Sequence, residues 1–268
     1  MMVGLAIMIV SEAATLAGIE PFASWNTPIC WTGFILFADA IVYRARGNSW
    51  IRSSPREFAA LALASIPLWV VFEGYNLVIR NWMYVGLPEN PVLRLFGYAW
   101  SFGTISPAIF EGAELVALAR GAGRAGRENT ASGALSIAVG AAMLIAPFVV
   151  PASNAPYFAA PVFLGFIFLL DPINKRLGEE TLTRDRTINL MLSGLLCGVL
   201  WEFWNNWSRA KWIYTVPIMQ HWKLFEMPLP GYLGFAPFAV ECFTMYVFVR
   251  ALYASMTSSR LRGRTIAL

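Results

Sequence analysis

Charged residues, histidine and cysteine are scarce in this sequence, and each scarcity excludes a class of function. Only 13% of the 268 residues are charged. His221 is the only histidine, which excludes bis-histidine haem and any metal site built from several histidines. Cys30, Cys197 and Cys242 are an odd number in apolar surroundings, so we expect buried free thiols and no disulfide framework. There is also no Gly-rich phosphate loop and no Ser-His-Asp set. We therefore expect no metal and no cofactor.

Apolar residues, in contrast, are abundant. They make up 57% of the chain, with 11 tryptophans, which is typical of a protein that crosses a membrane several times. The long apolar runs lack alternation, which favours helices over a closed barrel. Eight such segments lie near residues 3–18, 28–43, 57–80, 95–119, 133–151, 156–171, 187–208 and 230–252. The expected fold class is an all-α integral membrane protein with eight transmembrane helices.

The positive charges indicate an orientation. Most of the 20 Lys and Arg residues follow the second, fourth, sixth and eighth segments. The opposite loops carry the remaining five, which are Arg80, Arg94, Arg209, Lys211 and Lys223. Positive loops stay in the cytoplasm, so we expect both termini there, in an inner or plasma membrane. Orientation explains the net charge of +4, and no nucleic-acid partner is needed.

Two stretches roughly 130 residues apart carry the same polar motif. They share, in order, Glu, Asn, Arg, Trp, Tyr, Pro and Glu, which are Glu73, Asn76, Arg80, Trp82, Tyr84, Pro107 and Glu111 in the first and Glu202, Asn205, Arg209, Trp212, Tyr214, Pro237 and Glu241 in the second. Four segments per copy is an even number, so the copies should be parallel repeats related by an axis along the membrane normal. We expect repeats at 1–120 and 133–252, a cytoplasmic linker at 121–132 and a basic cytoplasmic tail at 253–268.

The repeated motif also supplies the candidate site residues. Ionisable groups inside a bilayer are costly and are usually functional. We take the four carboxyl residues as catalytic candidates, which are Glu73, Glu111, Glu202 and Glu241. The remaining motif residues are candidate substrate-binding groups, which are Asn76, Arg80, Trp82, Tyr84, Asn205, Arg209, Trp212 and Tyr214. We expect the two acids of each copy to line one cavity, and the second copy, which is richer in polar groups, to hold the principal site.

A second interpretation of the motif stays open. On a helix, residues at i, i+3 and i+7 share a face, so Arg80 lies on the stripe of Glu73, as Arg209 does on that of Glu202. These pairs are then structural ion pairs, or each arginine receives an anionic head group. In that case Glu111 and Glu241 are the better acid candidates.

The order of these residues resembles the membrane-integral lycopene cyclases, the duplicated type that uses no flavin. The clearest stretches are Trp201-Glu202 through Asn205, Lys211-Trp212-Ile213-Tyr214, and Phe225-Glu226-Met227-Pro228-Leu229. The chain departs from that family by carrying Glu at 73 and 202, where the family usually has Asp. The resemblance implies cyclisation or double-bond isomerisation of a lipid-soluble isoprenoid or carotenoid, without a redox cofactor.

Such a reaction gives a proton to an alkene, holds a cation and removes a proton elsewhere. Carboxyl groups and aromatic rings are suited to these tasks. Two alternatives remain: a ligand-binding or proton-coupled transporter, and a structural subunit of a membrane complex. In every case the chain's partners include membrane lipids.

Overall fold

The computed structural model describes residues 1–121 and 133–256, and the chain within these ranges is mostly helical. The helices are α1 (Met2–Leu16), α2 (Phe22–Arg46), α3 (Trp50–Ser53), α4 (Pro55–Ile79), α5 (Pro91–Arg120), α6 (Gly133–Val149), α7 (Ala159–Arg176), α8 (Arg184–Trp207) and α9 (Phe235–Met256). The short elements are β1 (Trp82–Val85), β2 (Lys211–Tyr214), β3 (Lys223–Leu224), β4 (Met227–Pro228), and the 3-10 turns η1 (Ala155–Phe158) and η2 (Leu229–Gly234). Apart from Gly121, the expected linker lies outside the described residues, and the described start of the expected tail, 253–256, belongs to α9.

Six helical segments of the described chain are long and apolar enough to cross a membrane. They are Phe22–Arg46, Pro55–Ile79, Pro91–Arg120, Ala155–Arg176, Arg184–Trp207 and Leu229–Met256. α1 and α6 are shorter apolar helices. Each of the eight falls on a segment expected from hydropathy. The sequence also sets their ends: the Asn90 side chain accepts backbone N–H groups at the start of α5, and Gly121 ends that helix in a left-handed conformation.

The helices pack in corresponding pairs in the two halves of the chain. α1 packs on α2, and α6 packs on α7. Both contacts are close because they occur at glycines: a Cβ on Gly4 would lie 2.4 Å from the carbonyl oxygen of Gly33, and one on Gly140 would lie 2.6 Å from that of Gly165. Likewise α5 packs on α2 and α4, and α9 packs on α7 and α8. Additional contacts of α5 with α8 and of α4 with α9 join the halves.

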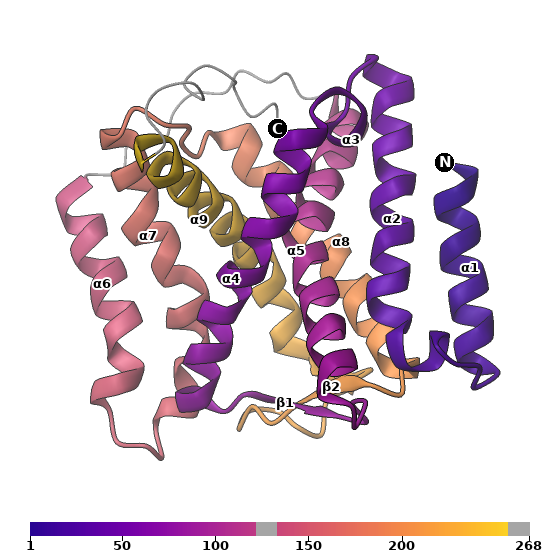
Figure 1. Cartoon of the computed structure of the whole chain (residues 1–268). Coiled ribbons are helices and arrows are strands. Elements are labelled where there is room, and N and C mark those ends of the chain that lie inside the picture. The colour runs from indigo at the N-terminus through magenta and orange to yellow at the C-terminus, as the bar shows by residue number, and fades with distance from the viewer. Residues whose placement is uncertain (122–132, 257–268) are drawn as a thin grey trace.

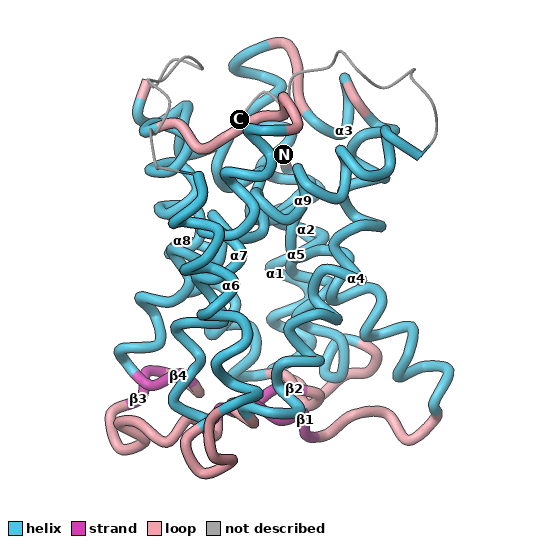
Figure 2. The backbone as a smooth tube through the Cα atoms, turned by 90° about the vertical axis from the view of Figure 1, so that its left-hand side faces the viewer, coloured by secondary structure: helices cyan, strands magenta, loops and turns pink. Residues whose placement is uncertain are grey.

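A two-stranded antiparallel ribbon closes one end of the bundle, where β1 pairs with β2 (Figure 1). Met83 is the direct partner of Ile213. These two residues occupy the same position, between Trp and Tyr, in the two motif stretches. Figure 2 shows that the ribbon lies at the end opposite to α3. The chain that follows each long helix, α4 and α8, therefore meets its counterpart at this end.

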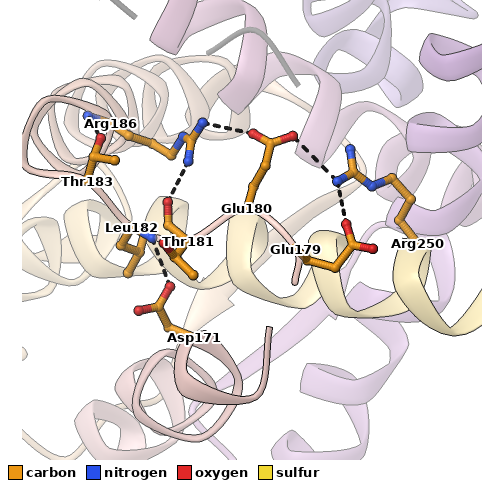
Figure 3. Close-up of polar contacts among 8 residues, drawn as sticks. All are labelled: Asp171, Glu179, Glu180, Thr181, Leu182, Thr183, Arg186 and Arg250. Atoms are coloured by element: carbon orange, nitrogen blue, oxygen red, sulfur yellow. Dashed lines mark hydrogen bonds and ion pairs between the residues drawn. The ribbon is translucent and has the colours of Figure 1, made fainter. Parts of the chain in front are cut away.

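At the other end, an aspartate in each half receives a backbone N–H group. The Asp39 carboxylate accepts the N–H of Ile51 at 2.9 Å. Figure 3 shows the corresponding contact of the second half, in which the Asp171 carboxylate accepts the N–H of Leu182 at 2.9 Å. Asp39 and Asp171 lie near the ends of α2 and α7, so each carboxylate fixes the turn into the following helix.

Charged side chains of the second half reinforce this end (Figure 3). Arg186 at the start of α8 is bound to Glu180 at 2.8 Å, and its guanidinium lies 4.9 Å from the centre of the Phe243 ring. Arg250 of α9 bridges Glu179 and Glu180 at 3.0 and 3.4 Å. α8 and α9 are therefore joined through the loop that precedes α8.

Candidate functional site

A cavity of about 490 Å³ lies between the two halves of the chain. Its wall is formed by α2, α4, α5, α7, α8 and α9, the β ribbon and η2. Most of its lining is apolar and aromatic, including Trp31, Trp69, Tyr98, Phe163, Trp201 and Phe238. A cavity of this size and character suits an apolar small molecule. Rings on several sides can also stabilise positive charge on such a ligand.

The ribbon contributes an aromatic face to this cavity. Side chains alternate along a strand, so Trp82 and Tyr84 share one face of β1, while Met83 points away and is 49% exposed. In the same way Trp212 and Tyr214 share one face of β2. All four aromatic side chains line the cavity. The motif residues Trp and Tyr are two positions apart, so they lie on the same face of each strand.

Behind this face, Glu202 of α8 accepts hydrogen bonds from β2. The Tyr214 hydroxyl donates to Glu202 Oε1 at 2.8 Å, and Trp212 Nε1 lies 3.4 Å from the same oxygen. Trp212 Nε1 also donates to the Tyr214 hydroxyl at 2.9 Å. Glu202 is fully buried. Burial and the neighbouring Glu202 carboxyl group raise the pKa of Tyr214 well above its ordinary value, so its hydroxyl keeps the proton it donates.

Glu73 of α4 is held in the same way by the first half. Its Oε1 accepts from the Tyr84 hydroxyl at 2.6 Å, from Trp69 Nε1 at 2.8 Å and from Trp82 Nε1 at 3.2 Å. Burial and the Glu73 carboxyl group also raise the pKa of Tyr84 well above its ordinary value. Glu73 is only half-buried and has the additional Trp69 donor, so the two acids are similar but not identical.

The motif asparagines connect each strand to the helix before it. Asn205 Nδ2 donates to the carbonyl of Trp212 at 2.8 Å, and its Oδ1 accepts the Trp212 N–H at 3.0 Å. Asn76 makes the same two contacts with Trp82, at 2.8 and 3.3 Å. Neither asparagine is among the described residues that line the cavity. In the structure these two asparagines, which the sequence suggests as substrate-binding residues, hold the backbone of Trp212 and Trp82 against the helices α8 and α4.

The motif arginines lie outside the helical stripes on which the sequence places them. α4 ends at Ile79, Arg80 has a left-handed backbone with φ 51°, and its side chain is exposed. α8 ends at Trp207, and Arg209 forms an ion pair with Glu20. Helical periodicity stops before both arginines. Within the described chain, no ion pair joins Arg80 to Glu73 or Arg209 to Glu202, and neither arginine lines the cavity.

Glu111 and Glu241 lie at contacts between helices. Both are fully buried. Glu241 Oε1 accepts the backbone N–H of Phe166 of α7 at 3.0 Å, and the Glu111 carboxyl group lies beside that of Asp39 of α2. Neither residue lines the described wall of this cavity. Glu73 and Glu202 instead reach the cavity through Tyr and Trp.

The motif alone does not identify several residues of the cavity wall. Trp31, Trp69 and Trp201 lie in apolar helices. In such a helix the sequence does not distinguish a tryptophan of a cavity wall from one that packs in the core. Asn81 lies between the motif residues Arg80 and Trp82, but the second stretch has no asparagine beside its Trp.

Comparison of the chain with family models, curated proteins and solved structures found no match.

Proposed function

We propose that the chain is an integral membrane protein of eight transmembrane helices, built as two parallel four-helix repeats. α1 and α6 complete the set of spans. The corresponding helix pairs and the ribbon register support this, because Met83 and Ile213 are equivalent residues and also direct strand partners. A two-fold axis through that pair relates one motif to the other. In this arrangement both termini face the cytoplasm of an inner or plasma membrane.

We infer further that the protein binds a lipid-soluble isoprenoid or carotenoid-type molecule and catalyses its cyclisation or double-bond isomerisation. One observation carries this inference: two Tyr–Glu pairs, Tyr84–Glu73 and Tyr214–Glu202, serve the same aromatic cavity. Tyr84 is the strand partner of Trp212, so both pairs lie at the same end of the cavity. They are therefore suited to give and take protons at neighbouring carbons of one bound chain.

The chemistry needs two carboxyl groups in different protonation states. One Tyr–Glu pair, with its carboxyl group protonated, passes a proton through its hydroxyl to a carbon–carbon double bond. A C–H bond forms and leaves a carbocation, which a second double bond of the same molecule attacks to close a ring. The other pair removes a proton from a neighbouring carbon, so the product keeps the formula of the substrate.

The cavity wall supports each of these steps. Trp69, Trp82 and Trp212 all line the cavity, and aromatic rings stabilise positive charge that develops beside them. The apolar lining excludes water, which would otherwise quench the cation. Because the two halves share this wall, both copies contribute to one reaction centre in this proposal. In this proposal, unlike the sequence-based expectation, the second copy does not hold the principal site by itself.

Expression in cells that accumulate an acyclic carotenoid or polyprenyl lipid tests this function. Extracted lipids should contain a product of unchanged mass and altered chromatographic mobility. The product should be absent from cells that express Glu202→Gln. Binding of the lipid to the purified protein without conversion would contradict the enzyme proposal and would favour the transporter. Arg56→Gln, an exposed change at the opposite end of the bundle, is the control and should leave conversion intact.

A further inference from the structure

Asn81, a residue of the apolar cavity wall, carries a side-chain amide without a hydrogen-bond partner in the described part of the chain. It lines the cavity wall and is only 2% exposed. Its backbone is fixed on both sides: the N–H donates to Asn76 Oδ1 at 2.8 Å, and the carbonyl accepts the N–H of Thr215 at 2.9 Å. Its side-chain Nδ2 and Oδ1, in contrast, have no hydrogen-bond partner among the described residues. The amide is therefore held in place and is not used by the protein.

Several other polar groups of the cavity wall do have protein partners. Lys211 Nζ is bound to Glu226 at 2.5 Å, Arg94 Nε donates to the carbonyl of Pro88 at 3.0 Å, and the Ser24 hydroxyl donates to Glu20 at 2.8 Å. Burying an amide without hydrogen bonds costs free energy, and buried amides without any hydrogen-bond partner are rare in proteins. Asn81 thus differs from these neighbours, because its amide hydrogen-bonds to none of the described residues.

The amide also breaks the two-fold relation between the halves. Asn81 directly precedes Trp82, and the residue that directly precedes Trp212 is Lys211. Lys211 is already held by Glu226, and Ala210 beside it has no polar side chain. Only the first-half edge of the ribbon therefore offers this free amide among the described residues. A ligand with a polar group at one end would bind in a single direction.

We propose that the cavity takes an isoprenoid alcohol, with its hydroxyl group bound by Asn81, in preference to a plain hydrocarbon. An amide supplies both a donor and an acceptor, and a hydroxyl group matches both. This substrate class rests on the proposed function, since it presumes that the cavity binds an isoprenoid. The hydroxyl group anchors one end of the isoprenoid beside the ribbon. This position determines which of its double bonds reach Tyr84 and Tyr214.

Competition binding on the full-length protein in lipid nanodiscs tests the proposal. Radiolabelled geranylgeraniol is the probe, and the C20 hydrocarbon of the same skeleton without oxygen is the competitor. The native protein should bind the alcohol about tenfold or more tightly than the hydrocarbon, because the hydrocarbon leaves the amide unpaired. Asn81→Leu, of similar size and apolar, should bring the two affinities together and keep or improve that for the hydrocarbon. Asn81→Ala is a second variant in case leucine does not fit.

The control variant is Asn154→Leu, an exposed asparagine outside the cavity wall, which should keep the native preference. Equal affinity of the native protein for both ligands would overturn the alcohol proposal and leave the proposed function standing. A preference that survives both substitutions of Asn81 would also overturn it. Failure of the native protein to bind either ligand would overturn the proposed function and this inference together.

Discussion

Tyr214 donates a hydrogen bond of 2.8 Å to the buried carboxyl group of Glu202, while its ring forms part of the cavity wall. Tyr214 therefore links a carboxyl group that does not line the cavity to the cavity wall. Tyr84 connects Glu73 in the same manner at 2.6 Å. This connection is the basis of the predictions that follow.

Removing either hydroxyl should slow proton transfer and leave the aromatic wall intact. We expect Tyr214→Phe and Tyr84→Phe each to lower turnover by roughly 10²-fold, the lower end of what general acid–base catalysis contributes. Substrate affinity should change little, since phenylalanine retains the ring. Conversion of an acyclic substrate by membranes that contain equal amounts of each variant measures this. Full turnover in either variant would show that the hydroxyl groups do not carry the proton.

Hydropathy was sufficient to predict the positions of the apolar helices, and the repeated motif included residues that the structure places in contact with one another. Apolar runs determine where helices form, but they do not reveal caps in polar sequence. α5 therefore begins at Pro91, after the cap at Asn90, a few residues before the expected segment. The motif identified Glu73 and Glu202 with their Trp and Tyr neighbours, because the same spacing occurs twice.

The roles within the motif required long-range information. The pairing of β1 with β2 joins residues far apart in sequence, and it decides which side chains face the cavity. Helical periodicity placed Arg80 and Arg209 beside the acids, but the helices end before those residues. Asn81 lacks a counterpart in the second copy, so comparison of the two stretches could not identify it.

The motif asparagines should contribute to stability. Asn205→Ala removes two hydrogen bonds to the backbone of Trp212 and leaves those backbone groups without their partner. We expect a loss of about 1–3 kcal/mol in the free energy of unfolding, with a similar loss for Asn76→Ala. Thermal unfolding in detergent, followed by tryptophan emission, measures it. Exposed Asn154→Ala should have little effect, and an equal loss there would argue against these hydrogen bonds as the source of the stability.

The ribbon register can be tested by cross-linking. Direct partners in an antiparallel pair have Cα atoms about 4.5–5.5 Å apart, within the range of a disulfide. Met83→Cys combined with Ile213→Cys should therefore form a disulfide on mild oxidation, detected by peptide mass spectrometry. Met83→Cys with Thr215→Cys, two residues out of register, should do so poorly. The native cysteines are buried and should not compete. Preferential cross-linking of the second pair would contradict the register.

Alkaline pH should weaken the ribbon. Folding raises the pKa of Tyr84 and Tyr214 above the ordinary value of about 10, because burial disfavours the ionised form. The stability contributed by these protons is fully present below about pH 10 and is lost as the pH rises through the folded-state pKa. Unfolding midpoints measured across this range should fall with pH, and the fall should be smaller in the Tyr84→Phe, Tyr214→Phe double variant. An identical fall in the double variant would contradict this assignment.

Deuterium incorporation tests the central claim, that the two Tyr–Glu pairs move protons on one bound isoprenoid. Membranes containing the protein are supplied with an acyclic isoprenoid in D₂O buffer, and the product is analysed by mass spectrometry. One exchangeable deuteron enters and one substrate hydrogen leaves, so the product should be one mass unit heavier than the substrate, and Tyr214→Phe should suppress it. A cyclised or isomerised product without deuterium, or an unchanged substrate in the presence of folded protein, would contradict the account.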